Sequence, residues 1–145
     1  MRLSSLIDRV DRLRPGTDPE LISHWTQYLC VLMSGMIEVS VQESFSEYAR
    51  ARSERRVSSY VDKQVSYLQN PKMEKIISLA APFDPVWAES LRAQTQGQLK
   101  DAVDSIVANR NSIAHGDPVG LSFSRLQEYH KSVCRVLDLV QSTCS

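Results

Sequence analysis

The stretch Asn109-Arg110-Asn111-Ser112-Ile113-Ala114-His115-Gly116 closes a helical pattern of apolar residues that begins near Gln98. At about 100° per residue, Arg110 falls near the centre of the apolar face. A guanidinium keeps its charge, so a buried one needs a carboxylate or a phosphate beside it. Gly116 suits a left-handed helix terminus, and the proline two residues later prevents the helix from continuing. We therefore expect a helix from about Gln98 to Ala114 with Arg110 in the core. The apolar face comprises Leu99, Ala102, Val103, Ile106, Ile113 and Ala114.

Three polar side chains gather at the end of this predicted helix. Asn111 and His115 are four residues apart, so they are neighbours on the helix surface, close to Arg110. An arginine, an amide and a titratable imidazole together suit the binding of a phosphodiester and the movement of a proton. The alternative interpretation is structural: Arg110 pairs with a glutamate, and His115 is an ordinary surface histidine.

Capping signals and apolar periodicity divide the rest of the chain into helices. Ser4 or Ser5 caps a short first helix, and Asp18-Pro19 opens a long helix that runs to about Arg52. No segment alternates with a period of two, so no strand is expected. The prediction is a single all-α domain over residues 1–145, a bundle of about six helices. The later helical segments run through 57–68, after Asn70-Pro71, after Asp84-Pro85, from about Gln98 to Ala114, and after Ser122 or Ser124.

The long helix is apolar over much of its circumference and is expected to be the central, most buried element. Its main stripe comprises Leu21, Trp25, Tyr28, Leu32, Met36 and Val39, and Val31, Gly35, Val41, Phe45 and Tyr48 widen it.

Two glutamates, Glu38 and Glu43, interrupt the apolar run of this helix. One interpretation places one or both at the outer edge of the stripe, because charged residues are rarely buried without a partner. The other pairs one of them with Arg110, which neutralises both groups in the core. We favour Glu38 as the partner, since its neighbours in sequence are more apolar.

Four arginines, Arg50, Arg52, Arg55 and Arg56, follow within seven positions. A solvated helix end is the simpler explanation, because basic side chains complement the helix dipole there. A local patch that contacts the phosphates of a substrate is the functional alternative. Among the aromatic residues, Trp87 is expected in the core, whereas Tyr129 is a further candidate for substrate binding.

Composition limits the classes of function. The chain has 145 residues with 42% hydrophobic residues, which suits one packed domain and excludes a disordered chain. Acids and bases balance at 17 each, so bulk charge does not indicate a protein that coats nucleic acid. The cysteines and histidines show no zinc spacing, and no metal site is expected. The first residues are too charged for a signal peptide, and no apolar run is long enough to span a membrane. A soluble cytoplasmic protein is expected.

The residues at the helix end resemble the signature of the HEPN superfamily. Arg110-Asn111-x-x-x-His115, followed by Gly116 and a further helix, is similar to its motif, and Asp101–Gly116 as a whole is close to the small stand-alone prokaryotic branch. The segment Asn70–Trp87 and the long helix that contains Glu38 also resemble that branch. Two residues after the histidine, where some toxins of the superfamily have a tyrosine that their antitoxin modifies, this chain has Asp117.

The resemblance implies an α-helical bundle that forms a homodimer with its two motifs facing each other. It implies a metal-independent endoribonuclease without a cofactor, in a toxin–antitoxin or phage-defence system with a partner protein. In that mechanism His115 is the general base or acid, Arg110 holds the scissile phosphate, and Asn111 orients the imidazole or the ribose. The alternative is a family member without catalysis, which serves as an interaction or nucleotide-binding module.

Overall fold

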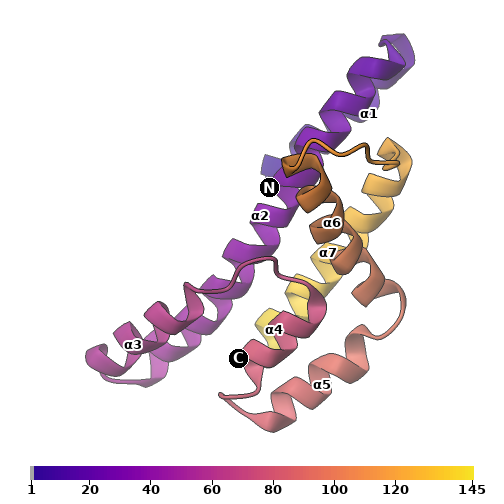
Figure 1. Cartoon of the computed structure of the whole chain (residues 1–145). Helices are drawn as coiled ribbons and strands as arrows, with labels where there is room; N and C mark the ends of the chain where they lie inside the picture. The colour runs from indigo at the N-terminus through magenta and orange to yellow at the C-terminus, as the bar shows by residue number, and fades with distance from the viewer. Residues whose placement is uncertain (1) are drawn as a thin grey trace.

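The computed structural model describes residues 2–145, which form seven α-helices and one 3₁₀ turn with no strand among them, as the all-α prediction requires (Figure 1). The total is one above the estimate of about six, although each of the seven helices corresponds to one of the helical segments predicted from the sequence. The elements are α1 (Arg2–Leu13), η1 (Arg14–Gly16), α2 (Pro19–Arg52), α3 (Arg55–Val65), α4 (Met73–Ala80), α5 (Pro85–Thr95), α6 (Gln98–Ala114) and α7 (Phe123–Thr143).

Local capping sets several of these boundaries as predicted. The Asp18 carboxylate accepts a hydrogen bond from the Glu20 N–H at 2.8 Å, and Asp84 accepts one from the Val86 N–H at 2.9 Å. Ser122 begins α7 by accepting from the Arg125 N–H at 3.1 Å. The predicted break between α5 and α6 is confirmed at Gly97, which has φ +81°.

Two predicted caps are wrong. Helix α1 already begins at Arg2, so Ser4 and Ser5 lie inside it rather than before it. Helix α4 begins at Met73, and Asn70 instead has a left-handed backbone with φ +49°. The first N–H of α4 donates to the Asp104 carboxylate of α6 at 2.8 Å. This cap comes from another helix, so no local pattern predicts it.

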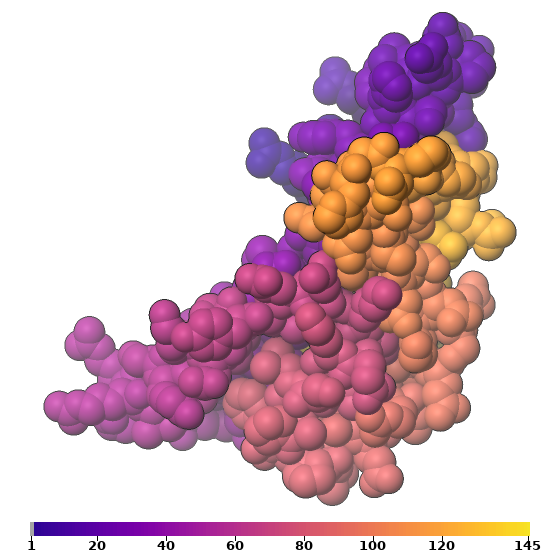
Figure 2. Space-filling model, in the orientation of Figure 1, coloured from indigo at the N-terminus to yellow at the C-terminus, as the bar shows by residue number. Residues whose placement is uncertain are grey.

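Helix α2 is the spine of the molecule, and α1, α3, α6 and α7 all pack against it (Figure 1). Helix α6 runs antiparallel to α2, and α7 returns antiparallel to α6. Figure 2 shows the turn after α1 and helix α3 projecting at opposite ends of the molecule. No helix within residues 2–145 is long and apolar enough to cross a membrane.

The face of α2 that lies in the core differs from the predicted stripe. Leu21, Tyr28 and Val39 of that stripe are 42%, 60% and 64% exposed. The buried face instead comprises Leu29, Cys30, Met33, Ile37, Val41, Phe45 and Ala49. Val41 and Phe45, which were expected to widen the stripe, lie in this core. Because α2 is apolar nearly all round, its periodicity predicts burial but not which side is buried.

Aromatic contacts fasten α4 and α5 to the far half of α2. The Phe45 ring lies 5.0 Å from that of Phe83, and the Tyr48 ring lies 4.9 Å from that of Trp87, edge to face. Trp87 packs against the core, which confirms the prediction for this residue.

The reassigned face of α2 is open to a direct test by truncation. Ile37 is fully buried, so Ile37→Ala should lower the free energy of unfolding by about 2–5 kcal/mol. Val86, which is 69% exposed on α5, is the control, and Val86→Ala should change it by no more than about 0.5 kcal/mol. Urea denaturation measures both. Equal effects would contradict the assignment.

Candidate functional site

Helix α6 ends in a Schellman motif that positions the candidate residues. The Gly116 N–H donates to the Ile113 carbonyl at 3.1 Å, and the Asp117 N–H donates to the Ser112 carbonyl at 2.9 Å. Gly116 has φ +76°, the left-handed conformation predicted for it. His115 is the C-cap residue of α6, with backbone angles φ −89° and ψ 0°. The motif thus places His115 directly after the final helical turn.

Arg110, Asn111 and His115 all lie in the last turns of α6 and its C-cap, and the first two are in contact. The Arg110 guanidinium Nη1 donates to Asn111 Oδ1 at 3.3 Å. Asn111 is half-buried, whereas Arg110 and His115 are exposed. The prediction that Arg110 lies in the core is wrong. Ala114 is exposed as well, whereas Ile113 of the same turn packs partly against the core.

The favoured pair of Glu38 with Arg110 is also absent, and the register of α2 against α6 explains why. The Cys30 thiol donates to the Ile106 carbonyl at 3.5 Å, which aligns these two residues across the antiparallel pair. Glu38 lies eight residues beyond Cys30, and Arg110 lies four residues beyond Ile106 in the opposite direction. At 1.5 Å per residue, about 18 Å separates them along the helix axes. Within residues 2–145 no ion pair joins Arg110 to either glutamate.

Glu43 pairs with Arg50 instead, in a network at the far end of α2. The Arg50 guanidinium hydrogen-bonds the Glu43 carboxylate, contacts Glu47 at 2.9 Å and lies 3.6 Å from Asp62 of α3. Three carboxylates therefore surround this arginine. Its charge is neutralised, which favours a structural role over contact with a phosphate.

The other members of the predicted basic patch are no better placed. Arg52 lies over the Tyr48 ring at 4.4 Å, and Arg56 is 3.9 Å from Glu54. Arg52 is 22 residues beyond Cys30 on α2, so about 39 Å of helix axis separates it from Arg110. Arg55 follows at the same end, as the first residue of α3. This patch therefore cannot contact the phosphodiester that Arg110 would hold.

Tyr129 is likewise remote from the motif. It is half-buried and lines a hollow of about 380 Å³ with Gln98 and Asp101, at the start of α6. Arg110 is nine residues beyond Asp101, so about 14 Å of helix separates them. The structure thus keeps Arg110, Asn111 and His115 together and separates the other predicted site residues from them.

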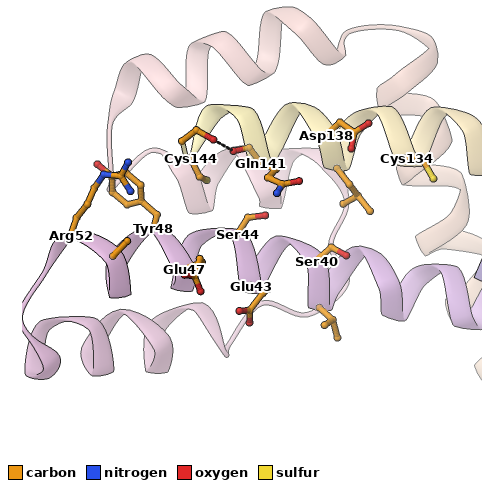
Figure 3. Close-up of a pocket in the computed structure, with 14 residues that line it drawn as sticks. Ser40, Glu43, Ser44, Glu47, Tyr48, Arg52, Cys134, Asp138, Gln141 and Cys144 are labelled. Carbon is orange, nitrogen blue, oxygen red and sulfur yellow. Dashed lines mark hydrogen bonds between the residues drawn. The ribbon is translucent and has the colours of Figure 1, made fainter. Parts of the chain in front are cut away.

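A groove of about 630 Å³ between the far halves of α2 and α7 lies away from this chemistry (Figure 3). Carboxylates from both helices line it, those of Glu43 and Glu47 on α2 and of Asp138 on α7. Cys134 also lines it, with its sulfur 3.5 Å from the His130 imidazole. Burial raises the pKa of the Cys134 thiol and lowers the pKa of His130. Both shifts favour the neutral forms, so this pair is not an activated thiolate.

Sequence reasoning overlooked one group of charged residues, the arginines Arg2, Arg9 and Arg12 of α1, which share one exposed face. Their spacing of seven and three residues places them on one helix face, and this pattern could have identified them from the sequence. No group of three or more His, Cys, Asp or Glu side chains suited to a metal ion occurs in the part of the chain that the structure describes.

The separation of Glu38 from Arg110 predicts that their substitutions act independently. The stability changes of Glu38→Ala and Arg110→Ala should add in the double variant to within about 0.3–0.5 kcal/mol. Phe45 and Phe83, whose ring centroids are 5.0 Å apart, form the positive control. A double-mutant cycle on these two residues should show a coupling free energy of about 0.5–1.5 kcal/mol. Urea denaturation of both cycles provides the measurement, and strong coupling between Glu38 and Arg110 would refute the register.

Comparison with known proteins agrees with this architecture. The family model described as RiboL-PSP-HEPN matches residues 2–145, which is nearly the whole chain. No curated protein and no solved structure gives a significant match. The matched range covers all seven helices and includes the Arg110–His115 motif at the end of α6. The chain therefore belongs to the RiboL-PSP-HEPN family and carries a HEPN-type domain of the all-α class.

Proposed function

We propose that this HEPN-type protein is a metal-independent endoribonuclease whose catalytic residues are Arg110, Asn111 and His115. The observation that carries the proposal is the open helix end. There Arg110, which makes no ion pair within residues 2–145, is hydrogen-bonded to Asn111, and the exposed His115 imidazole follows four residues after Asn111. The absence of the expected pair with Glu38 supports the proposal, because a guanidinium that no carboxylate neutralises is available to bind a phosphate. A ribonuclease of this family fits a toxin–antitoxin or phage-defence setting, in which a partner protein covers the motif.

The proposed reaction uses the substrate's own 2′-hydroxyl as nucleophile. The His115 imidazole takes the hydroxyl proton, and the 2′-oxygen attacks the adjacent phosphorus. The bond from phosphorus to the 5′-oxygen breaks, and that oxygen receives a proton. Arg110 binds the phosphate and the charge that develops on it, while Asn111 orients the guanidinium. The products are a 2′,3′-cyclic phosphate and a 5′-hydroxyl.

One chain supplies a single histidine at the motif, whereas this reaction needs a base and an acid. A symmetric homodimer brings two copies of the motif together, and His115 of the partner subunit then protonates the leaving oxygen. Facing motifs would place the interface at α6 and the start of α7, but the large apolar side chains that are exposed within residues 2–145 lie on other elements. Four of them follow the outer face of α2, namely Leu21, Tyr28, Val31 and Val39. We propose this α2 face as the surface that the second copy covers.

One observation favours a second function, that of a non-catalytic interaction module. The hollows between α2 and α7, between α3 and α4, between α6 and α7, and on α1 contain none of the three motif side chains. An open motif surface also suits the binding of a protein or a nucleotide without turnover. Cleavage assays with pure protein distinguish the two functions.

Substitution of the histidine tests catalysis. The pure protein should cleave RNA in the presence of EDTA and leave 2′,3′-cyclic phosphate ends. His115→Ala should lower the rate by about 100- to 10,000-fold, because the proton transfer loses its base. Glu89→Ala, at an exposed residue of α5 outside the motif and the α2 face, is the control and should keep the wild-type rate. Full activity in His115→Ala would reject the mechanism, and RNA binding without cleavage by the wild type would favour the module.

The proposed dimer has its own test. A carboxylate at the centre of the α2 face should oppose burial of that face, so Val31→Glu should give a monomer at micromolar concentration. RNA cleavage is measured on the same variant: α6 packs on the other face of α2, so a fall in cleavage would show that this contact also brings the two His115 side chains together. Val86→Glu on α5 is the control, since Val86 is exposed away from this face. Light scattering gives the mass. A monomeric wild type, or a dimer that survives Val31→Glu, would contradict the assignment.

A further inference from the structure

The charges on α1 are divided between its two sides. On one side Asp11 pairs with Arg14 at 3.0 Å, and Asp8 lies near enough to His130 of α7 to raise that histidine's pKa, against the larger, lowering effect of burial. Arg2, Arg9 and Arg12 share the adjoining side, and although Asp8 lies one turn before Arg12, none of the three makes an ion pair within residues 2–145. This second side is therefore a strip of uncompensated positive charge.

The strip is a continuous and rigidly held surface. Arg2, Arg9 and Arg12 are exposed and line, with Ser5 and Leu6, a shallow hollow of about 430 Å³. Their Cα atoms span about 15 Å of helix axis. The opposite side of α1 is anchored by Leu3 and Ile7, which are 6% and 4% exposed in the core. The arginines are thus presented by a helix that packs on the bundle through Leu3, Ile7 and Val10.

The strip lies in the same half of the molecule as the motif. Helix α1 runs back along the first half of α2, and η1 is tied to the start of α7 by the hydrogen bond of Arg14 to Ser124 at 3.2 Å (Figure 1). The end of α6 that carries the motif also lies against this half of α2, by the alignment of Cys30 with Ile106. The arginines near Arg52, by contrast, belong to the other end of α2.

From this arrangement we propose that the Arg2–Arg9–Arg12 strip binds the phosphates of an RNA segment that flanks the scissile bond. The proposal rests on the ribonuclease function argued above. One guanidinium group can bind two phosphate oxygens at once, and it stays charged at every physiological pH. An anionic membrane is a poorer ligand, because α1 buries its apolar side in the bundle and has none to insert into lipid.

Binding measurements on an inactive background isolate the strip. The probe is a fluorescein-labelled single-stranded RNA, titrated by anisotropy against protein that carries His115→Ala. Arg2→Gln, Arg9→Gln and Arg12→Gln together should weaken binding at least about tenfold at low salt. The slope of log affinity against log salt should fall by about 2, because each phosphate contact on a single strand contributes about 0.7. The matched control removes three other exposed charges with Lys63→Gln, Lys72→Gln and Lys131→Gln.

Cleavage assays with protein that retains His115 separate this inference from the proposed function. With the arginine variant, kcat/KM should fall for the long RNA and stay unchanged for a dinucleotide, which has no phosphate beyond the scissile one. If the wild type cleaves RNA and both triple variants bind it equally, the strip has no such role and the ribonuclease stands. If the strip binds RNA but the protein does not cleave it, the ribonuclease function is rejected and RNA binding by the strip is kept. Binding to phosphatidylserine vesicles in place of RNA would overturn the inference.

Discussion

The packing of one face of α2 against α6 and α7 is the constraint on which the rest of the structure depends. Met33, Ile37 and Val41 are fully buried along this face, and burial of each such side chain contributes about 1.5–3 kcal/mol. The alignment of Cys30 with Ile106 belongs to the same contact and sets how far α6 extends along the spine. In this register the last turn of α6 is only partly covered, with Ile113 packed against the core and His115 exposed. The openness of the motif therefore follows from core packing several residues away from it.

Much of the chain's local structure is readable from its sequence. Asp18-Pro19 and Asp84-Pro85 mark helix starts because a short side chain and a proline satisfy the first turn without help from elsewhere. Gly116 marks a helix end for an equally local reason, its positive φ. These features need only neighbouring residues, so the bounds of α2 and α6 and the position of the motif were predictable.

The features that failed are those that depend on a second helix. Periodicity showed that α2 is apolar, but its neighbours decide that Ile37 is buried and Val39 exposed. The same holds for Arg110, which lies on the apolar side of α6 by its periodicity and is nevertheless exposed in the fold. Arg50 shows the converse, since nearby Glu43 and Glu47 neutralise it and leave no basic patch. Side-chain charge is visible in a sequence, but its compensation is a property of the fold.

The exposure of Arg110 and His115 bears on how this family can diversify. Substitution of exposed side chains usually changes stability by no more than about 0.5 kcal/mol, so the motif is nearly independent of the forces that fold the bundle. A lineage can then lose or regain these side chains by single mutations while the helices remain folded. Selection on chemistry and selection on architecture act on separate residues. Such separation allows one scaffold to give rise to both active and inactive descendants.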